Sequence, residues 1–196
     1  MNPLNSVAGA VTTGVVLAIL VMLGIGPGQL NALSLARWLH ILSGVMWIGL
    51  LYYFNVVQIP GLAAAAADKG GPGGAGVSKY IAPRALLWFR WAALATWLTG
   101  AWYLGKNFVN AFTLGNFGQD TYGLVIGVGA WLGTIMLFNV WVLIWPNQKK
   151  VLGIVPASDE EKARARKVAT MASRTNFVLS VPMLLCMGGA SHGLPF

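Results

Sequence analysis

The fold is decided by a stretch without a single charged residue, YGLVIGVGAWLGTIMLFNVWVLIW (residues 122–145). An α-helix needs about 20 apolar residues to cross the roughly 30 Å hydrocarbon core of a bilayer. This stretch is long enough, and Pro146 follows it at a position where a proline favours the end of a helix. It therefore predicts a membrane-spanning helix.

Four further stretches meet the same requirement of length and apolar composition. Of the 196 residues, 57% are hydrophobic and only 9% are charged, whereas soluble domains carry roughly a quarter charged residues. This balance excludes a soluble enzyme, a disordered chain and a nucleic-acid-binding domain. We expect an all-α, polytopic membrane helix bundle that forms one domain over residues 1–196. The five predicted transmembrane helices cover about residues 7–25, 33–57, 83–104, 122–145 and 176–194.

The positive charges predict the orientation of the bundle, because Lys and Arg collect in cytoplasmic loops. Ten of the 13 basic residues lie in or beside the second-to-third and fourth-to-fifth connections. The other side has only Arg37 and Lys106, and Arg90 lies within the third span. The N-terminus is therefore expected in the cytoplasm and the C-terminus in the periplasm, as in a multi-pass protein of a bacterial inner membrane. The ten residues are Lys69, Lys79, Arg84, Lys149, Lys150, Lys162, Arg164, Arg166, Lys167 and Arg174.

Polar residues around the inner ends of the spans carry further expectations. Ser158 followed by Glu161 is typical of a capping box, which predicts a cytoplasmic amphipathic helix over about residues 158–174. Asn55 and Asn139 are expected to join helices by hydrogen bonds. For Arg90 we expect a side chain that reaches the inner headgroups, the alternative being contact with an anion, a quinone or a cofactor.

The only two histidines, His40 and His192, are predicted in the same, outer leaflet. Gly44 lies four residues deeper than His40 on one helix face, and Gly188 and Gly189 lie four and three residues deeper than His192. A flat macrocycle with two axial imidazole ligands needs missing side chains about one turn from each ligand. The pattern gives the hypothesis of a b-type haem whose iron is bound by His40 and His192.

Arg37, one turn outward of His40, would then face a haem propionate. Two alternatives remain open. The glycines and histidines serve helix packing and hydration alone, with no cofactor, or a copper or other single metal ion uses the histidines with a soft ligand from Met183, Met187 or Cys186. No carboxylate lies inside a predicted span, which disfavours a proton pump or carboxylate-driven transporter and leaves the catalytic residues unknown.

One long motif and three short ones carry a resemblance to a known family. They are ARWLHILSGVMWIGLLYYFNVVQIP (36–60), PRALLWFRW (83–91), LTG (98–100) and SH (191–192). Together they resemble the membrane domain of the bacterial urate oxidase, or urate hydroxylase, family. Full-length members of that family have several spans and a C-terminal cytochrome c domain, so this chain corresponds to a short form without that domain.

The resemblance implies an integral-membrane oxidoreductase or electron-transport subunit. Its partners would be the lipid bilayer and a periplasmic cytochrome c or a larger membrane redox complex, and no nucleic acid. A second reading from a different class is a non-catalytic accessory or scaffolding subunit of a membrane complex. Urate oxidation by the chain itself is a third possibility, for which no base is evident inside the spans.

Overall fold

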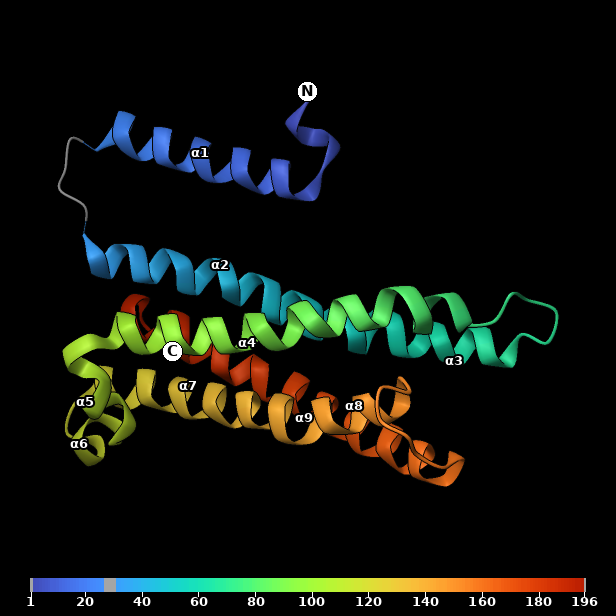
Figure 1. Cartoon of the computed structure of the whole chain (residues 1–196). Coiled ribbons are helices and arrows are strands. Elements are labelled where there is room, and N and C mark those ends of the chain that lie inside the picture. Colours follow the sequence, from blue (N-terminus) through green and yellow to red (C-terminus); the bar gives the residue numbers. More distant parts are fainter. Residues whose placement is uncertain (1, 27–30, 196) are drawn as a thin grey trace. The chain divides into compact units, whose positions relative to one another are not determined.

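A computed structural model describes residues 2–26 and 31–195, which contain helices and no strand. The chain divides into two compact units, Met1–Leu35 and Ala36–Phe196. The α-helices are α1 (Val7–Ile25), α2 (Ala32–Tyr52), α3 (Ile59–Ala67), α4 (Ala82–Leu104), α5 (Phe108–Phe112), α6 (Leu114–Gly118), α7 (Thr121–Phe138), α8 (Trp145–Val151) and α9 (Asp159–His192) (Figure 1). The π-helical segments are η2 (Tyr53–Gln58), η3 (Val77–Ile81) and η5 (Asn139–Ile144), and the 3₁₀ turns are η1 (Pro3–Asn5) and η4 (Gly105–Asn107).

The first unit contains α1, whose bounds coincide with the predicted first span. Ser6 caps its start, because the Ser6 hydroxyl accepts a hydrogen bond from the Gly9 N–H at 3.0 Å. All nineteen residues of α1 are uncharged, so its length and composition satisfy the requirement for crossing a bilayer.

In the second unit, helices continue beyond two of the predicted ends. Helix α2 runs through η2 into α3, so the chain stays helical past Pro60 to Ala67, ten residues beyond the predicted end at residue 57. Helix α7 runs through η5 into α8, past Pro146 to Val151. Both prolines lie in the first turn after a π-helical segment, where the N–H that a proline lacks is least needed.

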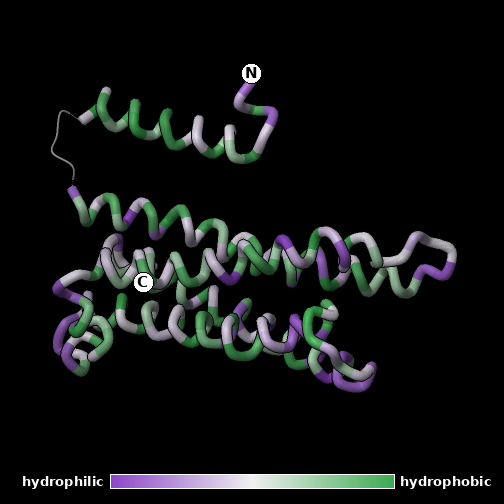
Figure 2. The backbone as a smooth tube through the Cα atoms, viewed as in Figure 1, coloured by the Kyte–Doolittle hydropathy of each residue, from purple (hydrophilic) through white to green (hydrophobic). Residues whose placement is uncertain are grey.

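Helix α9 joins the predicted amphipathic helix and the predicted fifth span into one element. The predicted capping box is confirmed, since the Ser158 hydroxyl accepts from the Glu161 N–H at 3.2 Å and the Glu161 carboxylate accepts from the Ser158 N–H at 2.8 Å. The helix passes through Pro182 and ends at His192. In Figure 2 hydrophilic residues gather around α5 and α6 and around the turn from α8 to α9, while the middles of the long helices are hydrophobic.

Four helices in the described residues are long and apolar enough to cross a membrane. Helix α4 is not among them, because Arg84, Arg90 and its tryptophans lower its hydropathy. The all-helical membrane class is therefore confirmed, whereas the predicted third span, α4, and with it the count of five spans, stay predictions. The four helices are Val7–Ile25, Ala32–Ala67, Thr121–Val151 and Asp159–His192.

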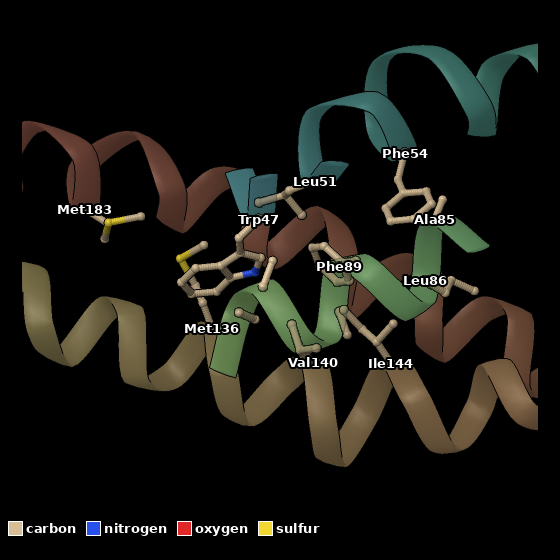
Figure 3. Packing of buried hydrophobic residues seen from close by; sticks show 13 residues of the cluster. Trp47, Leu51, Phe54, Ala85, Leu86, Phe89, Met136, Val140, Ile144 and Met183 are labelled. Atoms are coloured by element: carbon tan, nitrogen blue, oxygen red, sulfur yellow. The ribbon is translucent and has the colours of Figure 1, made fainter. Parts of the chain in front are cut away.

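The core of the second unit lies between α2, α4, α7 and α9. Phe89 of α4 is 1% exposed and meets the ring of Phe54 edge-on, with 5.4 Å between centroids. Trp47 and Leu51 of α2 are buried beside them, with Met136 of α7 close to the Trp47 ring (Figure 3). Although α4 carries Arg84 and Arg90, it supplies the middle of the core, and Trp47 is a packing residue.

Candidate functional site

His40 is held in one orientation by the backbone of α4. Its side chain is half-buried, and Nδ1 lies 2.8 Å from the carbonyl oxygen of Thr96. A carbonyl oxygen only accepts hydrogen bonds, so Nδ1 carries the proton and donates it. In the neutral ring Nε2 then keeps its lone pair, and within residues 2–26 and 31–195 no hydrogen bond to Nε2 is formed. Histidine ligands of metals are commonly oriented in this way through the other ring nitrogen.

Gly100 provides the space in which the His40 ring lies. Thr96 and Gly100 are four residues apart on one face of α4, directly against the ring. A Cβ atom on Gly100 would lie 2.9 Å from both Nδ1 and Cε1 of His40, which is closer than packed atoms approach. The imidazole therefore depends on a glycine at this position.

The two other predicted site residues on α2 have ordinary surroundings. The Arg37 side chain is exposed about one turn before His40. A Cβ atom on Gly44 would lie 3.7 Å from the Thr96 methyl group, which is a normal packing distance. Gly44 thus faces α4, and the Thr96 side chain already fills the space beside it.

At the end of α9, His192 is exposed, and its two glycines differ. No atom lies within 4 Å of a Cβ placed on Gly188, so that position is open. At Gly189, the Leu194 side chain comes within 2.5 Å of such a Cβ, because the last residues fold back over the helix end. Of the two positions predicted to make room for a macrocycle, Gly188 is free and Gly189 is covered.

The structure brings His40 together with Thr96 and Gly100 and places His192 on a separate helix end. Within the second unit, the early part of α2, the end of α4 and the end of α9 lie at the same end of the bundle (Figure 1). We call this region the histidine end. It also contains α5, α6 and the first turns of α7.

The soft side chains considered for copper pack against α7. Met183 is 5% exposed and belongs to the core. A Cβ atom on Gly129 would lie 3.2 Å from the Cys186 Cβ and 3.3 Å from the Met187 Cε, so these residues fill the contact between α7 and α9. In the part of the chain that the structure describes, no group of three or more His, Cys, Asp or Glu side chains is arranged to hold a metal.

A second polar region lies deeper in the bundle. The Asn139 amide donates to the Asn176 side-chain oxygen at 2.8 Å, and the Asn176 amide donates to the Met136 carbonyl at 2.9 Å. The Asn55 amide donates to the Ser173 hydroxyl at 2.9 Å. The expected cross-links by Asn55 and Asn139 are therefore present, and we call these four side chains (Asn55, Asn139, Ser173 and Asn176) the asparagine layer.

Arg90 is stacked on an aromatic ring. Its guanidinium carbon lies 3.7 Å from the centroid of the Trp145 ring, and the side chain is half-buried. This is a cation–π contact between α4 and the start of α8. The charge of Arg90 thus has a partner inside the protein.

These observations define the class as an all-helical membrane protein with one pre-oriented histidine. Comparison with protein families then gives a match of residues 119–196 to the family described as urate oxidase N-terminal. The resemblance to this family is thereby confirmed over that range, which contains His192, whereas the long motif around His40 lies outside it. No curated protein and no solved structure matches the chain.

Proposed function

We propose that the chain is an integral-membrane redox subunit related to membrane-bound urate oxidase, with one b-type haem bound through His40 and His192. The main observation in support of this proposal is the 2.8 Å hydrogen bond from His40 Nδ1 to the Thr96 carbonyl. It supports an imidazole whose Nε2 is available as an axial ligand. The open position at Gly188 also supports the proposal, because it leaves space beside His192. Gly189, which Leu194 covers, and Gly44, which packs against Thr96, do not add to that space.

The proposed topology has five spans, with the N-terminus in the cytoplasm and the C-terminus in the periplasm. The uneven distribution of Lys and Arg supports it. The central position of α4 in the core also supports it, because Phe89 is 1% exposed between helices that are apolar enough to span the bilayer. A helix packed among spanning helices is the natural fifth span. We place the protein in a bacterial inner membrane.

Each residue of the proposed site has its own task. A bound haem supplies one-electron transfer. His40 and His192 hold the group from α2 and α9, Gly100 leaves space for the His40 ring, and Arg37 offers a cation to a propionate. Electrons would be exchanged with a periplasmic cytochrome c or with a larger membrane redox complex.

The test is the absorbance spectrum of detergent-purified protein expressed with adequate haem supply. We expect a Soret band in the wild type that is lost or shifted in both His40→Ala and His192→Ala. Gly49→Ala is the matched control, because no atom lies within 4 Å of a Cβ at that position. A colourless wild type, or a band unchanged by His40→Ala, refutes the haem proposal.

The second candidate is an accessory subunit without a cofactor. The Leu194 side chain over Gly189 favours it, since that contact makes the glycine a packing residue. In this case the chain would still bind its partner complex after both histidines are replaced by alanine. Co-purification of the wild type and of the double variant with membrane partners separates the two functions.

A further inference from the structure

The side of α9 that faces η5 carries two adjoining hollows. One, of about 410 Å³, lies between α9 and η5 and is lined mainly by apolar groups, including Leu143, Val168 and Met171. The other, of about 380 Å³, lies along α9 and is lined by Arg166, Thr170 and Arg174 among others. Lys167 and Met171 line both, so the two hollows lie side by side on α9, and we call the pair the α9 groove.

The basic groups of the groove are spaced regularly on one face. Arg166, Thr170 and Arg174 follow one another at intervals of four residues, which places them about 6 Å apart along the helix. Arg166, Lys167 and Arg174 are exposed. In residues 2–26 and 31–195 the structure has one ion pair, Lys162 with Asp159, so these three cations have no acidic partner there.

The apolar part of the groove lies beside the basic part, at nearly the same height along α9, and extends to η5. Leu143 and Asn139 belong to η5, inside the predicted fourth span, whereas Arg166 and Lys167 lie in the predicted cytoplasmic part of α9. A ligand that fills both parts needs an anionic head beside the arginines and a hydrocarbon chain along Leu143 and Met171. An anionic phospholipid has both, and clusters of Lys and Arg at the cytoplasmic side of a membrane helix attract such headgroups.

We propose that this groove is a binding site for one anionic phospholipid of the surrounding membrane. The phosphate lies between Arg166, Lys167 and Arg174, where bidentate arginine contacts are available. One acyl chain follows Val168, Met171 and Leu143. Charge complementarity selects the headgroup, and the apolar lining distinguishes a lipid from a free phosphate ion.

The experiment is lipid binding to the full-length chain in detergent, counted by native mass spectrometry. The probes are dioleoylphosphatidylglycerol, dioleoylphosphatidylcholine and the chain-free anion glycerol phosphate. We expect the phosphatidylglycerol complex to be retained in roughly tenfold preference to phosphatidylcholine. Arg166→Gln and Arg174→Gln should each reduce this preference severalfold. Glycerol phosphate should not compete at equal concentration.

Arg164→Gln is the matched control. Arg164 is exposed on the same helix but is turned about 200° from Arg166, and it lines neither hollow. A loss of preference as large in Arg164→Gln as in Arg166→Gln would show a general charge effect and overturn the site. Equal binding of the two lipids, or equal competition by glycerol phosphate, would overturn it as well.

Discussion

The two polar regions of the second unit join their helices by different means. At the histidine end, glycines bring backbones close together, and the His40 imidazole donates to a main-chain carbonyl. In the asparagine layer, side-chain amides bridge neighbouring helices. The Asn139 and Asn176 amides each donate to another residue, and Asn55 Oδ1 stays buried without a hydrogen bond. At the histidine end it is a ring nitrogen, Nε2 of His40, that forms no hydrogen bond within the described residues. The comparison indicates that the amides serve stability, whereas the half-buried imidazole keeps a lone pair of the kind that metal ligands use.

The largest expected effect comes from the asparagine layer. Asn176→Ala removes the partner of the Asn139 side-chain amide and one of the two donors to the Met136 carbonyl, which still accepts from the Asn139 backbone N–H. Asn176 is fully buried. Losing both hydrogen bonds and leaving the Asn139 amide unpaired should lower the free energy of unfolding by about 2–4 kcal/mol. Unfolding in mixed detergent and SDS measures it. Thr175→Ala, at the exposed neighbouring position, is the control. An equal loss of unfolding free energy in both variants would contradict a stabilising role of the asparagine layer.

The next effect tests close packing at the histidine end. A Cβ atom on Gly127 would overlap the Ala111 carbonyl oxygen, so Gly127→Ala should push α5 away from α7 and cost about 1–3 kcal/mol. Gly133→Ala, on the same helix with no atom within 4 Å of the new Cβ, should be neutral or slightly stabilising. Thermal unfolding of the two variants side by side is the measurement, and equal melting temperatures would contradict the packing account.

The sequence predicts the helices of this fold better than it predicts the contacts between them. The lengths of the apolar stretches and the positions of the prolines predicted α1, α4 and the long apolar helices, and Ser158 with Glu161 predicted the start of α9. The partner of His40 could not be predicted, because a backbone carbonyl has no signature in the sequence. Which glycine faces which helix depends on the rotation of each helix in the bundle. Composition alone does not set that rotation.

The backbone conformation of the connection from α4 to α7 could not be predicted from the sequence either, because it too depends on contacts between helices. Leu114, Asn116 and Phe117 have φ values of 54°, 55° and 61°, together with positive φ at Gly115 and Gly118. A left-handed turn of this kind costs roughly 1–2 kcal/mol for each non-glycine residue. Only its contacts with the first turns of α7 make it stable, so local propensity could not indicate it.

A smaller effect is expected at Arg90. Arg90→Gln removes the cation 3.7 Å from the Trp145 ring centroid and should lower the free energy of unfolding by about 1 kcal/mol. Arg84→Gln, on the exposed side of the same helix, is the control. If both variants unfold alike in SDS titration, the stacking contact contributes nothing specific.

The smallest effect is confined to low pH. The pKa of Asp120 is lowered from its ordinary value of 3.8, first by the hydrogen bond from Asn110 at 2.6 Å and further by the Gly123 and Tyr122 N–H groups, while burial opposes the shift. A lowered pKa in the folded state means that this contribution to stability is full above the ordinary pKa and disappears as pH falls through the lowered one. The melting temperature should therefore fall more steeply below about pH 3.8 in the wild type than in Asp120→Asn; parallel pH profiles would contradict this role.

The most direct test of the central claim is low-temperature electron paramagnetic resonance of the oxidised, purified protein. Two imidazole ligands give low-spin ferric haem, so the account predicts a low-spin signal in the wild type. His40→Ala and His192→Ala should each abolish it or convert it to high spin, and Gly100→Ala should perturb it by displacing the His40 ring, while Gly49→Ala leaves it unchanged. A wild type without a haem signal, or a low-spin signal that survives His40→Ala, would contradict the account.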